Sequence, residues 1–268
     1  MSHSPRLVVI ISAGLAVVVL AGLGWYLLKG KSGSSSVQVT PTPVPVPVNT
    51  LDVSKRPFVV LQPLPGRNEL AITIGKLAIP AKTVEVTLEY DRNKGVLDAV
   101  LKQFPLTGDT LNETVFLGSK SAGGHTTYHE DVIGGSLTLA FIGTEPYTLK
   151  VPWHYADTQK EYSELSTTDG FFQAVLDKPI KQSKIIVMQS PGPPAGFPGE
   201  LIAGPYLIRT VGDLPKVNAQ VSIRLAQDSP NAVLYGWDGN AWIKLTAAIE
   251  GKTVIYNGPL YSVFAVSR

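Results

Sequence analysis

The residues best suited to chemistry follow a loop of glycine and serine at residues 118–124. Two histidines and two carboxylates come next, and they are His125, His129, Glu130 and Asp131. Imidazole and carboxylate groups are zinc ligands, which makes these four the candidates for a metal site. On an extended strand, however, residues four apart are separated by about 13 Å, too far to share one ion. We therefore expect no metal and no cofactor, unless a turn brings them together.

The same segment contains the residue types of a hydrolase. Ser121, with His125 or His129 and with Asp131, would supply a nucleophile, a base and a carboxylate. Ser121 is not in a Gly-x-Ser-x-Gly motif, because position 119 is serine. A tethered hydrolase using a metal or serine site between Gly118 and Asp131 is therefore the alternative function.

An aromatic hairpin is expected between residues 234 and 245, which read LYGWDGNAWIKL. Asp238-Gly239-Asn240 suits its turn, since Asp-Gly and Gly-Asn both tolerate positive φ. Either position of the turn places three rings on one face, and they are Tyr235, Trp237 and Trp242. If exposed, the rings form a platform that could bind a sugar ring or a partner protein. If covered, they belong to a core, and both interpretations remain open.

This hairpin carries a Trp-Asp-Gly-x-x-Trp-x-x-Leu motif from Trp237 to Leu245, and a last strand is expected at 261–266. Over residues 200–268 the chain resembles the C-terminal Ig-like β-sandwich modules of bacterial single-pass surface proteins. The resemblance implies a fold and a surface location. Such modules have no single activity that could be carried over.

Short strands separated by turns dominate the rest of the chain. Residues 83–90 and 217–225 alternate strictly between apolar and polar, as expected of strands with one buried face. Further strands are expected at 58–62, 70–74, 113–117, 136–142, 147–153, 171–176, 184–189, 205–209, 232–237, 241–245, 253–256 and 260–266. This pattern predicts an all-β protein with antiparallel sandwiches. The exception is 96–103, where apolar residues at helical spacing predict a short helix.

The N-terminal segment predicts a membrane anchor. Residues 7–28, from Leu7 to Leu28, contain no charge and no proline, and a helix of that length spans about 33 Å. Trp25 and Tyr26 lie at its end, where such rings favour the membrane interface. A cleaved signal peptide is the alternative, although the apolar run is longer than usual. Membrane lipid is thus the expected partner of this segment.

Composition shifts divide the chain. Prolines at every second position from Pro41 to Pro47 favour an extended stalk, and the proline-rich segment 190–204 interrupts the strands. The expected parts are a transmembrane anchor at 1–31, a Ser/Pro-rich linker at 32–56, a β-sandwich domain at 57–190 and a C-terminal β-sandwich domain at 198–268.

Charge and cysteine content exclude some functions. Three of the 23 Lys and Arg residues lie within residues 1–31, and the remaining 20 face 21 Asp and Glu residues, a net charge of −1. Because residues 32–268 are nearly neutral, they lack the basic surface that nucleic-acid binding requires. The chain has no cysteine, so disulfides are excluded. We expect a cell-membrane protein with extracytoplasmic domains, no enzymatic activity, and a structural, adhesive or binding role toward a surface glycan or an envelope protein.

Overall fold

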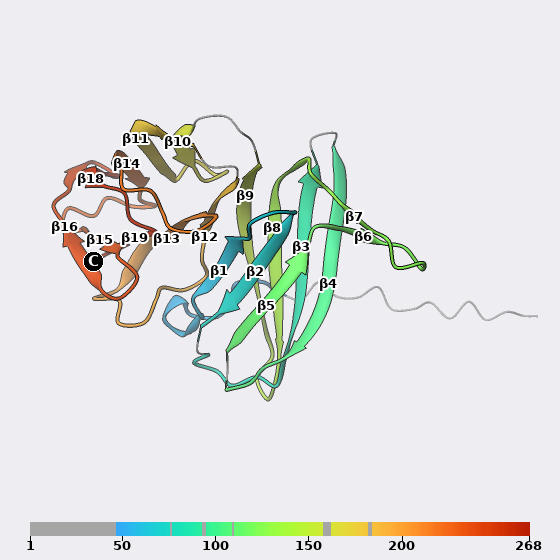
Figure 1. The fold of residues 1–268 in the computed structure, drawn as a ribbon. Coiled ribbons are helices and arrows are strands. Elements are labelled where there is room, and N and C mark those ends of the chain that lie inside the picture. Colours follow the sequence, from blue (N-terminus) through green and yellow to red (C-terminus); the bar gives the residue numbers. More distant parts are fainter. Residues whose placement is uncertain (1–46, 76, 93–94, 109, 158–161, 182–183) are drawn as a thin grey trace, which may run out of the picture. The chain divides into compact units, whose positions relative to one another are not determined.

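The computed structural model describes residues 47–268 except 76, 93–94, 109, 158–161 and 182–183 (Figure 1). Within this part, regular structure is extended except for one 3-10 turn, η1 (Val53–Lys55), so the all-β prediction is confirmed there. The expected anchor at 7–28 and most of the 32–56 linker lie outside the described residues. Among the residues that are described, no helix has the length and apolar character needed to span a membrane.

The strands of the described residues form four antiparallel sheets. The largest has the order β16 (Trp242–Leu245), β15 (Val233–Trp237), β19 (Val263–Ser267), β13 (Leu201–Thr210), β12 (Lys184–Gln189), β9 (Tyr147–Asp157), β8 (Val132–Ile142), β3 (Thr83–Arg92) and β4 (Val96–Pro105). A three-stranded sheet contains β1 (Val59–Pro63), β2 (Glu69–Ile74) and β5 (Leu111–Phe116). A five-stranded sheet contains β10 (Tyr162–Ser166), β11 (Phe172–Ile180), β14 (Asn218–Arg224), β18 (Thr253–Pro259) and β17 (Ala248–Glu250). The hairpin of β6 (Gly118–Lys120) and β7 (Thr126–Tyr128) stands alone.

Two hydrophobic cores lie against the nine-stranded sheet. In the first core, residues of β3, β8 and β9 pack with the β1-β2-β5 sheet. The largest fully buried side chains of this core are Trp153, Tyr90 and Phe141. In the second, residues of β13, β15 and β19 pack with the five-stranded sheet around Phe172 and Phe264. Figure 1 shows β1, β2 and β5 beside one group of sheet strands and β11, β14 and β18 beside another.

Strands β12, β13 and β19 contribute to both cores. Along β12, Met188 belongs to the first core and Val187 to the second. Along β13, Leu207 belongs to the first core and Ile208 to the second. Because successive side chains of a strand point to opposite faces, a strand that is covered on both faces must be apolar throughout, as β12 is from Ile185 to Met188.

The expected helix at 96–103 is wrong, because these residues form the start of β4. β4 pairs with β3 along its whole length, from Arg92–Val96 to Thr83–Pro105. The helical spacing arose because this strand has apolar residues on both faces, and long-range pairing with β3 overrides the local pattern.

The strand pairing does not mark a domain boundary at residues 190–198, where the sequence predicts one. The segment between β12 and β13 contains that boundary, yet the two strands pair with each other in one sheet. β10 and β11, which precede the boundary, contribute to the second core. The division into 57–190 and 198–268 stays a prediction.

The end of the linker is tied to β9. Val48 forms a parallel bridge with Thr148. The Asn49 amide N–H donates to the Thr148 carbonyl at 2.9 Å, and the Asn49 side chain exchanges hydrogen bonds of 2.8 and 3.0 Å with the Lys150 backbone. Arg56 also donates to the Asn49 carbonyl, at 2.5 Å. The chain therefore enters the described fold at a fixed position on the nine-stranded sheet.

Burial at neighbouring positions of β3 and β4 gives a test of this arrangement. Leu88 is fully buried in the first core, whereas Leu101 is 70% exposed. We expect Leu88→Ala to lower the free energy of unfolding by about 2–5 kcal/mol, through lost burial and a cavity. Leu101→Ala should change it by less than about 0.5 kcal/mol. Urea unfolding of the full chain in detergent, followed by circular dichroism, measures both, and equal losses would contradict the assigned faces of these strands.

Candidate functional site

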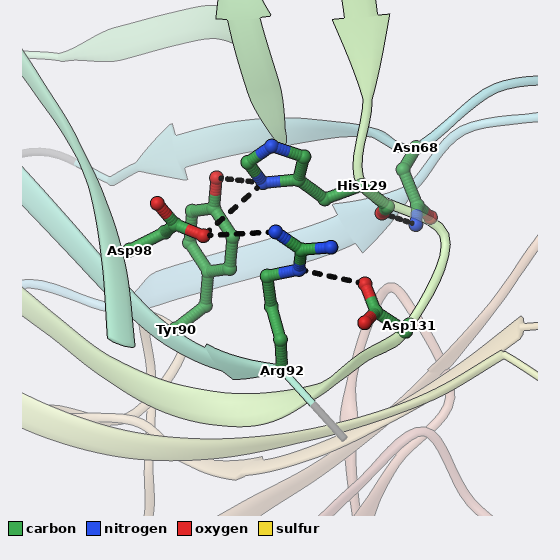
Figure 2. Close-up of polar contacts among 6 residues, drawn as sticks. All are labelled: Asn68, Tyr90, Arg92, Asp98, His129 and Asp131. Atoms are coloured by element: carbon green, nitrogen blue, oxygen red, sulfur yellow. Dashed lines mark hydrogen bonds and ion pairs between the residues drawn. The ribbon is translucent and has the colours of Figure 1, made fainter. Parts of the chain in front are cut away.

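His129 lies in a polar cluster where the β6–β7 hairpin meets the nine-stranded sheet (Figure 2). Tyr90 and Arg92 come from the end of β3 and Asp98 from β4, while Asp131 immediately precedes β8. The cluster forms because β4 pairs with β3 along one side, and because β8 pairs with β3 on its other side.

The cluster is held by hydrogen bonds and ion pairs. The Tyr90 hydroxyl lies 3.0 Å from His129 Nδ1, and Asp98 Oδ2 lies 3.4 Å from the same nitrogen. Arg92 donates from Nε to Asp131 at 2.7 Å and approaches Asp98 at 3.6 Å. Burial, then the Asp98 charge, raises the pKa of Tyr90 to about 12. The phenol therefore keeps its proton and can donate it to His129.

This geometry favours a structural role over a metal site. The Arg92 guanidinium lies against both carboxylates of the cluster, which places a positive charge where a cation would bind. In the described ranges, no group of three or more His, Asp or Glu side chains could hold a metal ion. Asn68 donates to the His129 carbonyl at 2.5 Å, so the backbone of this residue is fixed as well. The cluster secures the base of the hairpin.

The other sequence candidates near His129 are separated from it. His125 and Ser121 lie at the exposed tip of the hairpin, where the Ser121 amide donates to the His125 carbonyl. Glu130 is exposed. Three residues of extended β7 separate His125 from His129, a spacing of about 13 Å. The fold does not bring Ser121, His125 and His129 together.

The aromatic hairpin is formed by β15 and β16, with Trp237 directly opposite Trp242. The two rings lie 5.3 Å apart and pack against the first core, while Leu234 and Leu245 on the other face belong to the second. This is the alternation that the sequence predicts. Tyr235, Trp237 and Trp242 are each half-buried, so the rings combine a packing role with accessible edges.

Phe197 joins these rings, although sequence reasoning did not select it. Its ring makes edge contacts with Tyr235 at 5.7 Å and with Trp242 at 4.9 Å. It comes from the proline- and glycine-rich segment between β12 and β13, where it is the only aromatic residue among residues 190–200. A lone aromatic residue in a proline- and glycine-rich segment is the sequence feature that could have indicated Phe197 as a member of the aromatic group.

Two hollows meet at Trp237. One, of about 1020 Å³, is lined by residues that include Phe58, Pro194 and Phe197. The other, of about 800 Å³, is lined by residues that include Arg209 and Tyr261. Trp237 and Gly239 line both. Both volumes are in the range of small-ligand sites, so the tip of the hairpin separates two candidate binding spaces.

Arg209 is the second residue that sequence reasoning missed. Its Nε is shielded from solvent and has no hydrogen-bond partner within the described part of the chain. Burial lowers the pKa of this guanidinium. A buried donor without a partner loses free energy that an incoming acceptor can restore. Arg209 is one of three cationic side chains that line the second hollow, beside three carboxylates; the charged lining residues are Arg209, Lys178, Lys216, Asp177, Asp213 and Asp238.

Comparisons of the chain with protein-family models, with curated proteins and with solved structures find no match.

The two histidines of the hairpin allow a matched test of the polar cluster. His129→Ala removes the partner of the buried Tyr90 hydroxyl and should lower the free energy of unfolding by about 1–3 kcal/mol. It should also speed hydrogen exchange of the β6–β7 amides. His125→Ala, at the exposed tip, is the control and should change neither quantity. Equal effects of the two substitutions would refute a structural role for His129.

Proposed function

We propose that this chain is a membrane-anchored extracytoplasmic binding protein that holds an acidic saccharide at Trp237 and Arg209. The anchor is the apolar segment at residues 7–28, and the C-terminal side is placed outside the membrane because a Ser/Pro-rich stalk follows it. The observation that carries the binding role is the hollow that the half-buried Trp237 ring and Arg209 line together.

The two side chains suit different parts of such a ligand. Trp237 and Arg209 lie two strands apart on one face of the sheet, because Trp237 is opposite Val263 and Val263 is opposite Leu207. Two strand spacings are about 10 Å, and Arg209 lies two residues, or about 7 Å, along β13 from Leu207, so the backbones of Trp237 and Arg209 are about 12 Å apart, the scale of two sugar rings. The indole can pack against the apolar face of a sugar, while the guanidinium can bind a carboxylate with two parallel hydrogen bonds.

The fold supports this role without chemistry. Sheets that face each other across each core are consistent with β-sandwiches, and we retain the Ig-like character of the two domains as part of the proposal. One fold can carry many functions, so the binding role rests on the residues at Trp237 and Arg209. The hydrolase alternative has less support, since Ser121 and His125 lie at the hairpin tip and His129 at its base.

Retention on immobilised polysaccharides tests the proposal. The full chain in detergent should bind polygalacturonate and bind neutral galactan at least about tenfold more weakly. Trp237→Ala should weaken binding about tenfold or more, and Arg209→Lys should reduce the preference for the acidic polymer, because lysine lacks the bidentate geometry.

Phe171→Ala is the control for this experiment. Phe171 is a 39% exposed ring next to β11 that lines neither hollow, so its loss should leave retention unchanged. Circular dichroism of each variant confirms folding. The proposal fails if the two polymers are retained equally, or if Trp237→Ala behaves like Phe171→Ala.

A further inference from the structure

Strand β4 is an open edge of the nine-stranded sheet (Figure 1). Within the described residues it pairs only with β3, so along its other side the N–H and C=O groups of a ten-residue strand have no described strand as partner. Its side chains are unusually apolar for an edge, since Leu97 is 64% exposed and Leu101 70% exposed. Ile133, at 45% exposure, extends this surface on β8.

Edges of this kind promote pairing with another strand. Natural proteins usually blunt them with short strands, several charges or bulges. β4 has ten residues, two charged side chains, Asp98 and Lys102, and a proline only at its last position, Pro105. Its pairing with β3 is regular from end to end. The strand thus has the length, the regularity and the exposed leucines of an interface.

We propose that β4 pairs with β4 of a second copy of this chain, antiparallel and about a twofold axis at Val100. In this register residue 98 of one copy faces residue 102 of the other. Asp98 therefore meets Lys102 of the second copy, and the symmetry makes this contact twice. Opposite charges directly across an antiparallel pair are stabilising, whereas like charges are not.

The apolar residues fit the same register. On the face that carries Asp98, Val96 meets Phe104 of the second copy, and the two Val100 residues meet at the axis. On the opposite face, Leu101 meets Ala99 and lies diagonal to Leu97 of the second copy. Shifting the axis by one residue along the strand removes the Asp98–Lys102 pair. Asp98 contacts Arg92 and His129 through Oδ2, while a third of its side chain is exposed, so the proposed pair with Lys102 uses its other oxygen, Oδ1.

This interface is small, and it suits molecules held in one membrane. Ten residues of edge pairing bury less area than a stable dimer in free solution requires. Two chains anchored in the same bilayer have a high effective concentration, which favours a weak contact. Self-association through β4 is therefore expected for the anchored chain.

Single cysteines give a direct test, because the chain has none of its own. In the proposed register the two Val100 Cα atoms lie about 5 Å apart, within the range of a disulfide. The full-length Val100→Cys chain, reconstituted in lipid vesicles and mildly oxidised, should form a covalent dimer. The two Val96 positions would be about 26 Å apart, so the Val96→Cys chain should form no covalent dimer. A mixture of Val96→Cys and Phe104→Cys chains should form one, because these two positions face each other in the proposed register.

Val175→Cys is the control for random collision. Val175 is 43% exposed on β11, which has a neighbouring strand on each side. Dimer formation by Val100→Cys should exceed that of Val175→Cys at least about tenfold, given the distance requirement of a disulfide. Equal yields, equal dimer from Val96→Cys, or no product from the mixed chains would each overturn the proposal.

A charge reversal tests the same register independently. Lys102→Glu in the Val100→Cys chain would set Glu opposite Asp98 and should abolish most of the covalent dimer. Lys178→Glu, at an exposed position of β11, should leave the yield unchanged. Both substitutions are on the surface, so both chains should fold. An unchanged yield with Lys102→Glu would overturn the pairing.

Discussion

Both cores depend on strands that are apolar on two faces. Met188 and Leu207 support the first core, and their neighbours Val187 and Ile208 support the second. A polar residue at any of these positions would be buried without compensation on one side or the other. The same constraint applies to the aromatic hairpin, whose tryptophans pack on one core while Leu234 packs on the other. The candidate site is therefore attached to the most constrained strands of the fold.

Alternation made most strands predictable, and its failures have physical causes. Residues 83–90 and 217–225 read as strands because only one of their faces is buried. β4 read as a helix because an edge strand with apolar residues on both faces mimics helical spacing. β6 and β7 were missed since Gly-Ser-Lys and Thr-Thr-Tyr carry little apolar alternation, and the hairpin is held instead by contacts to the distant residues Asn68 and Tyr90.

The candidate site was predictable only in part, for a related reason. Trp237 and Trp242 belong to one hairpin, so local spacing placed them together. Phe197 and Arg209 reach the same region through segments that are distant along the chain, and no local pattern could have placed them there. The His129 cluster is similar: Arg92 and Asp98 become its neighbours only once β3, β4 and β8 are paired. Residue types near His125 suggested chemistry, but strand geometry separates them.

The contact of Asn49 with β9 has a mechanical consequence. Any pull that arrives from the N-terminal side enters the described fold at this asparagine, which is held to Thr148 and Lys150 by three hydrogen bonds and to Arg56 by a fourth. Val48 forms its bridge parallel to β9, so the chain meets this strand at the same point where the four hydrogen bonds hold it. Tension would thus enter the largest sheet at β9, and β12, β13 and β19 lie between that strand and β15, which carries Trp237.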